Sequence, residues 1–291
     1  MLKYRFFFGT LMTVFFTAVV ILGGWLDGSL TASGADDRTV QGTILCILIC
    51  ALIIPAQFEF SKLATAKNLK IFTSVTIIAS ILFAGTWYWL QLISISPEIY
   101  VFFLSAFSLF GLVSCQYICH GTSGIIANCG ANYFSIIYLG LLSGLVLAVR
   151  IDFGIWPLLM FIFTVKSADI GAYAVGSLFG RHKFSPKISP GKTWEGMGGA
   201  IATAMIVAIL FAVSCDIMGW WLAAIFGFCF AFAGQFGDLV ESMIKRDAEQ
   251  KDSAKRVPGF GGILDIIDSP LLGAPFAYLF FTFTVEVPVL Q

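Results

Sequence analysis

Charged side chains are scarce in this sequence. Only 12% of its 291 residues are Asp, Glu, Lys or Arg, whereas soluble domains carry about 25%. Hydrophobic residues make up 58%, and the mean hydropathy is +0.92. This shortage of charge excludes a sizeable soluble domain. With a formal net charge of zero, we also expect no nucleic-acid partner.

Long apolar runs replace the missing polar surface. A helix of about 20 apolar residues crosses the hydrocarbon layer, because it satisfies its own backbone N–H and C=O groups. We therefore predict an all-α, polytopic integral membrane protein with about nine transmembrane helices. The predicted spans are residues 6–25, 43–60, 71–92, 100–119, 133–149, 153–171, 197–214, 220–240 and 269–285.

Basic residues are distributed unevenly between the predicted loops. With a cytoplasmic N-terminus, every Lys and Arg except Arg38 and Arg150 lies on the inner side, as the positive-inside rule requires. The first run follows Lys3 and Arg5 but exceeds a signal-peptide core of about 7–15 residues, so we expect a retained anchor. The short chain indicates a bacterial inner (plasma) membrane, with the active site facing the cytoplasm.

We expect neither a cysteine-based site nor a P-loop. The seven cysteines are odd in number and mostly lie in apolar runs, where they act as small hydrophobic residues. The GKT sequence at Gly191 would need glycine at position 186 to form a P-loop, and Pro186 stands there.

Clustered polar chemistry is absent from the first half of the chain. We divide the sequence into N-terminal transmembrane helices, 1–150, which pack and anchor, and a C-terminal catalytic region with cytoplasmic loops, 151–291. Ionisable groups are costly at membrane depth, so carboxylates there mark function. Four such carboxylates occur in the second half: Asp169, Asp238, Asp265 and Asp268.

The segment GDLVESMIKRD places two acids and a base on one helix face. Asp238, Glu241 and Lys245 follow i, i+3, i+7 spacing. Glu241 and Lys245 form an ordinary intrahelical pair in the simplest interpretation. Asp238 has no basic residue within one turn of its own helix, so we predict a partner from elsewhere.

The segment PGFGGILDIIDS has two interpretations. Gly259, Gly261 and Gly262 permit close backbone approach and could cradle a phosphate, while Asp265 and Asp268 hold a divalent cation. Alternatively, the glycines form a turn and the aspartates cap the next helix.

A basic loop follows a polar span in the segment 167–196. Asp169 and Tyr173 are one helical turn apart in the span, and Lys183, Lys187 and Lys192 lie in the proline-interrupted loop. The lysines either face phosphates in a shaped site or obey the topology rule and contact anionic lipid headgroups.

Several motifs within 166–270 together resemble phosphatidate cytidylyltransferases, also called CDP-diacylglycerol synthases. In order, they are DIGAYAVGSLFG, SPGKTWEG, GDLVESMIKR, the KD pair at Lys251, and PGFGGILDIIDS. The first half shares only a multispan character. Two departures are Phe260 and Ile266, where the family usually has His and Arg; one imidazole and one guanidinium are missing, while the carboxylates remain.

The resemblance implies that CTP and phosphatidate react to give CDP-diacylglycerol and diphosphate for phospholipid synthesis. It implies Mg²⁺, a possible K⁺, membrane lipids and a possible homodimer as partners. By position, Asp238 and Asp265 are the metal ligands and, with Asp268 and Lys245, the catalytic residues. From the motifs and the resemblance together, we expect the substrate-binding residues to be Lys192, Lys187, Asp169, Tyr173, Glu241, Arg246, Lys251, Gly259, Gly261 and Gly262.

Three alternatives remain at this point. A secondary transporter also uses carboxylates within spans, but it predicts polar breaks in two repeated halves, and no such repeat is visible. A related cytidylyltransferase could act on a different lipid phosphate. A non-catalytic relative, suggested by Phe260 and Ile266, would not bind CTP.

Overall fold

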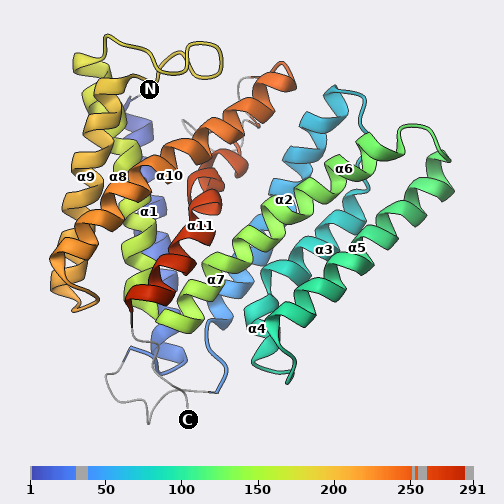
Figure 1. Cartoon of the computed structure of the whole chain (residues 1–291), viewed down its shortest axis with the longest axis horizontal. Helices are drawn as coiled ribbons and strands as arrows, with labels where there is room; N and C mark the ends of the chain where they lie inside the picture. Colours follow the sequence, from blue (N-terminus) through green and yellow to red (C-terminus); the bar gives the residue numbers. More distant parts are fainter. Residues whose placement is uncertain (1, 31–38, 251–252, 255–260, 286–291) are drawn as a thin grey trace.

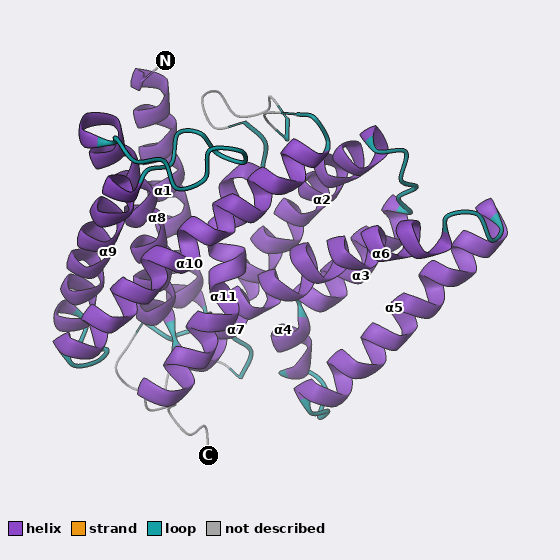
Figure 2. Cartoon of the chain, turned by 45° about the horizontal axis from the view of Figure 1, so that its top comes forward, coloured by secondary structure: helices purple, strands orange, loops and turns teal. Residues whose placement is uncertain are grey.

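The structure is a computed structural model that describes residues 2–30, 39–250, 253–254 and 261–285. Within these residues the regular elements are helices, in agreement with the predicted all-α fold (Figure 2). Lys251, Gly259 and Phe260 lie outside the described residues, so their predicted roles stay predictions.

The chain folds into long helices that run up and down through the molecule (Figure 1). They are α1 (Leu2–Leu26), α2 (Thr43–Ala66), α3 (Thr73–Ala84), α4 (Thr86–Leu90), α5 (Pro97–His120), α6 (Ile125–Ser135), the π-helix η2 (Ile136–Leu141), α7 (Leu142–Phe153), α8 (Ile155–Phe179), α9 (Trp194–Ser214), α10 (Trp220–Asp247) and α11 (Leu264–Thr284).

Eight stretches of helix among the described residues are long and apolar enough to cross a membrane, which confirms the polytopic prediction. The predicted span at 71–92 is divided: α3 has 12 residues, and α4 begins after Gly85. The predicted span at 133–149 lies within a longer helical rod, Ile125–Phe153. The count of nine and the cytoplasmic N-terminus stay predictions.

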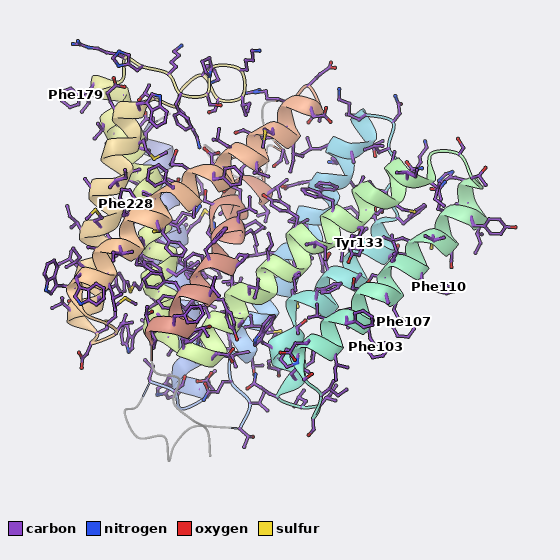
Figure 3. The ribbon with its side chains drawn as sticks, viewed as in Figure 1. Phe103, Phe107, Phe110, Tyr133, Phe179 and Phe228 are labelled. Atoms are coloured by element: carbon purple, nitrogen blue, oxygen red, sulfur yellow. The ribbon has the colours of Figure 1, made fainter. Side chains whose placement is uncertain are left out.

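The outer surface is rich in large apolar side chains. On α5, Phe103, Phe107 and Phe110 all project outward (Figure 3), and Phe110 is 73% exposed. Contiguous apolar surface of this kind is unfavourable in water and favourable against lipid chains.

Buried side chains from both halves of the chain share a hydrophobic cluster. Ile53 and Leu147 belong to the same cluster as Phe161 and Phe281. The predicted halves are therefore packed together, and residues of the first half can reach a site in the second.

A close crossing of α10 and α11 sets the geometry of the acidic residues. A Cβ atom at Gly237 would lie 2.8 Å from the Cα atom of Ser269, a distance that only glycine avoids. Because the two backbones touch here, Asp238 of α10 and Asp268 of α11 are brought next to each other.

Candidate active site

The basic loop between α8 and α9 has a defined fold. Lys183 and Thr193 form an antiparallel bridge, and the backbone N–H of Phe184 donates to the carbonyl of Lys192 at 3.2 Å. The Thr193 hydroxyl caps α9 by accepting from the N–H of Gly196 at 3.1 Å. These bonds fix the backbone on both sides of Lys192.

Lys192 supplies the partner that Asp238 was predicted to need. Its ammonium nitrogen lies 2.7 Å from Asp238 Oδ2 and donates to the carbonyl of Gln235 at 2.8 Å. The Gln235 side chain in turn donates to Asp169 Oδ1 at 3.1 Å. A shaped polar site is thus formed by the loop, α8 and α10.

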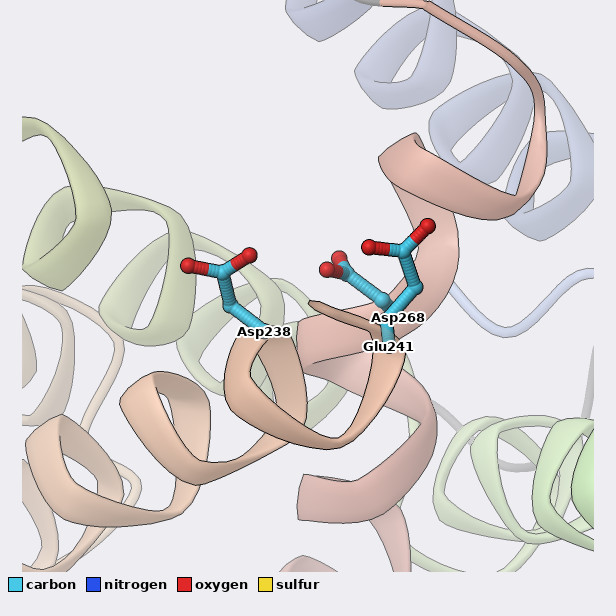
Figure 4. Close-up of side chains that lie close together, drawn as sticks. All are labelled: Asp238, Glu241 and Asp268. Carbon is cyan, nitrogen blue, oxygen red and sulfur yellow. The ribbon is translucent and has the colours of Figure 1, made fainter. Parts of the chain in front are cut away.

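Three carboxylates converge beside this ion pair. One oxygen from each of Asp238, Glu241 and Asp268 lies within 4.8 Å of the others. Figure 4 shows the side chains of α10 and α11 directed into the same space. Glu241 is fully buried and Asp268 is 3% exposed, so water screens their mutual repulsion poorly.

Asp265 has a different set of partners. Its carboxylate receives hydrogen bonds from Lys245 at 2.6 Å, from the Ser253 hydroxyl at 2.7 Å and from the backbone N–H of Gly262 at 2.7 Å. Gly261 turns the chain here with a φ of 105°, in the region that favours glycine. Asp265 therefore binds the turn that precedes α11, whereas Asp268 one turn later joins the acidic cluster; the metal-ligand role of Asp265 stays a prediction.

Lys245 connects the two groups of carboxylates. It forms the predicted intrahelical ion pair with Glu241, and it also binds Asp265 of α11. One ammonium group thus joins the end of α10 to the start of α11.

Glu59 in α2 is a residue that the sequence prediction missed. Its carboxylate is buried and accepts from the backbone N–H of Leu264 at 3.0 Å, and the Ser253 hydroxyl lies 3.2 Å from the same oxygen. A carboxylate near the end of an apolar span was the available signal, because such a group is costly there. Nothing in the local pattern around Ser253 marked it.

The remaining predicted residues lie farther out. Tyr173 on α8 is 57% exposed, and Lys187 is exposed on the basic loop. Arg246 donates to the carbonyl of Ile188 at 3.2 Å and so holds this loop against α10. The ammonium group of Lys166 donates to the backbone carbonyl of Ile266 at 2.9 Å, a contact that does not depend on the side chain at position 266.

The charges of the site suit a divalent cation. The three carboxylates of the cluster, together with Asp169 and Asp265, form ion pairs with or lie beside three lysines, which leaves a formal excess of two negative charges. The lysines are Lys166, Lys192 and Lys245. The Oε1 atom of Glu241 accepts no hydrogen bond from the described residues. An all-oxygen donor set with an unused buried oxygen fits a hard cation such as Mg²⁺.

Comparison with known proteins gives a consistent result. The family model described as "Cytidylyltransferase family" matches residues 38–284. Proteins named phosphatidate cytidylyltransferase are 39% identical over 127 residues in Mycobacterium bovis and 38% identical over 140 residues in Haemophilus influenzae. The matches cover 44% and 45% of this chain and 41% and 48% of those relatives, so they span less than half of each relative. In Chlamydia pneumoniae a relative of the same name is 36% identical over 180 residues, 56% of this chain and 57% of the relative.

Proposed function

The chain belongs to the cytidylyltransferase family, and from this premise we propose that it transfers the cytidylyl group of CTP to phosphatidate, giving CDP-diacylglycerol and diphosphate. The names of its relatives support phosphatidate as the acceptor. The observation that carries the proposal is the convergence of Asp238, Glu241 and Asp268 beside Lys192. Transfer of a phosphate-linked group needs a metal cation and hydrogen-bond donors close together, because both stabilise the negative charge of the phosphates.

The reaction requires positioning more than proton transfer. An ionised phosphate oxygen of phosphatidate attacks the α-phosphorus of CTP and forms a new P–O bond. The bond from the α-phosphorus to the oxygen that bridges to the β-phosphate breaks, and diphosphate leaves with that electron pair. Because both reactants are anionic, the obstacle is charge repulsion and alignment. In this proposal Lys192 and Lys245 orient the phosphates.

Asp238, Glu241 and Asp268 are the residues that would hold Mg²⁺. When bound, the ion would neutralise negative charge on the nucleotide phosphates and on the departing diphosphate. In this proposal Asp265, which accepts hydrogen bonds from Lys245, Ser253 and Gly262, orients Lys245 and the turn before α11. We include K⁺ in the proposal as a second, monovalent cation, to be tested by replacing it with Na⁺.

An apolar cavity beside the site supports a lipid acceptor. It measures about 480 Å³ and lies next to the polar residues, because Gln235 lines it and also bonds to Lys192 and Asp169. Other lining residues are Phe184, Trp194, Met197, Phe230 and Ala233. The acyl chains of phosphatidate would occupy this cavity while the phosphate reaches the acidic cluster. The proposal also places this end of the molecule at the cytoplasmic face of a bacterial inner membrane.

The test is transfer of label from CTP, labelled at its α-phosphate, to lipid by the purified protein with Mg²⁺. Phosphatidate and an isoprenoid lipid phosphate are offered separately as acceptors. We expect labelled CDP-diacylglycerol only with phosphatidate. Labelling of the isoprenoid acceptor alone would overturn the assigned substrate, and no labelling of either acceptor by folded protein would overturn the proposed activity.

A further inference from the structure

A buried tyrosine from the first half of the chain packs against α11, the helix that carries Asp268. Tyr138 belongs to the π-helix η2 and is 3% exposed. Its ring stacks on Phe134, with centroids 5.6 Å apart and planes at 10°, and it packs in the same buried cluster as Leu264 and Leu271 of α11. Isolated π-helical turns are rare and occur frequently at functional sites.

The hydroxyl group of Tyr138 has no hydrogen-bond partner among the described residues. Leu264, Asp268 and Leu271 follow i, i+4, i+7 spacing on α11, so the buried cluster that contains Tyr138 lies on the same face of α11 as Asp268. A buried hydroxyl without a partner is unfavourable in an apolar interior, so such groups mark places where a ligand or water completes the site. The unused donor therefore belongs to a side chain packed on the face of α11 that carries Asp268, one of the three residues that would hold the cation.

The position of Tyr138 complements the lysines. Lys192 and Lys245 form ion pairs with Asp238 and Glu241. Tyr138 comes from another element, η2, and carries no charge. Another lysine would compete with a metal cation for the carboxylates. A neutral hydroxyl group can donate to a phosphate oxygen without this competition.

We propose that Tyr138 is a substrate-binding residue whose hydroxyl donates a hydrogen bond to a phosphate oxygen held at the acidic cluster. The inference rests on the proposed function and adds a contribution from the N-terminal half of the chain. The phosphate belongs either to CTP or to phosphatidate, and kinetics with each substrate varied in turn distinguishes the two.

The decisive variant is Tyr138→Phe, which removes only the hydroxyl and keeps the ring that stacks on Phe134. We expect kcat/KM for the substrate whose phosphate is bound to fall about 10- to 100-fold, as for a lost hydrogen bond to a charged group. We expect no loss of thermal stability, because the hydroxyl makes no hydrogen bond with the described residues of the free protein.

Tyr133→Phe is the matched control on the same helical rod. The Tyr133 hydroxyl is hydrogen-bonded to Ser105 at 2.5 Å, on a part of the rod that packs against α5. We expect this variant to lose thermal stability and to keep its kcat/KM. The two variants therefore separate a substrate contact from a structural one.

A binding readout separates this inference from the proposed function. CTP with Mg²⁺ and, separately, phosphatidate should raise the melting temperature of the wild type, and Tyr138→Phe should reduce one of these shifts. If the wild type transfers no cytidylyl group but the variant reduces a shift, the function fails and the inference stands. Wild-type kinetics and wild-type shifts in Tyr138→Phe would overturn the inference, as would a defect confined to the Mg²⁺ requirement, which would assign the hydroxyl to metal-bound water.

Discussion

Glu59 and Leu264 are 205 residues apart in sequence, yet the carboxylate of the first accepts a 3.0 Å hydrogen bond from the backbone N–H of the second. Leu264 is the first residue of α11, and N–H groups in the first turn of a helix have no partner within it. A side chain from α2 thus completes the start of the helix that carries Asp265 and Asp268.

Replacement of Glu59 by alanine should destabilise the protein. The change leaves the buried N–H of Leu264 without this acceptor, at a cost of about 1–3 kcal/mol, and removes a neighbour of Ser253. Thermal unfolding in detergent checks the prediction. Glu59→Gln keeps an acceptor oxygen and should lose less stability than Glu59→Ala. Equal melting temperatures for wild type and Glu59→Ala would show that this contact does not stabilise α11.

Replacement of Lys192 by methionine should reduce activity. The variant loses the ion pair with Asp238 and the bond to the carbonyl of Gln235, and we expect kcat/KM to fall about 10- to 100-fold. Lys183→Met is the matched control, because its exposed side chain lies on the same loop. A similar loss in both variants would mean that the loop acts only through its general positive charge.

A larger side chain in the apolar cavity should impair long-chain phosphatidate more than a short-chain analogue. Ala233→Phe reduces the space that we assign to the acyl chains. We expect a higher KM for long-chain phosphatidate, with the KM for CTP and the rate with a short-chain analogue unchanged. Equal effects on both acceptors would remove the cavity from the lipid path.

Local spacing in the sequence predicted the local relationships of the site. The shared face of Asp238, Glu241 and Lys245 follows from helical periodicity, and the absence of a base near Asp238 correctly predicted an external partner. The apolar runs likewise predicted the membrane-spanning helices. In lipid, the backbone N–H and C=O groups must form hydrogen bonds within the protein, and few structures other than helices allow this.

Contacts between distant segments were not predictable in this way. Asp265 and Asp268 share a motif, but the first turn of α11 directs one to Lys245 and Ser253 and the other to the acidic cluster. The contacts of Glu59 depend on how α2 packs against α11, which leaves no periodic signal in either segment. For the same reason Tyr138 was indistinguishable from an ordinary core residue.

The most direct measurement of the central claim is the Mg²⁺ dependence of cytidylyl transfer in Asp268→Asn, Asp265→Asn and Asp247→Asn. Asp247 is an exposed carboxylate at the end of α10 and serves as the control. We predict that Asp268→Asn raises the required Mg²⁺ concentration at least about tenfold, since it removes a charge from the cluster. Asp265→Asn should slow turnover sharply without this shift, and Asp247→Asn should match the wild type. Wild-type activity and Mg²⁺ dependence in Asp268→Asn would contradict the assignment of the acidic cluster as the cation site.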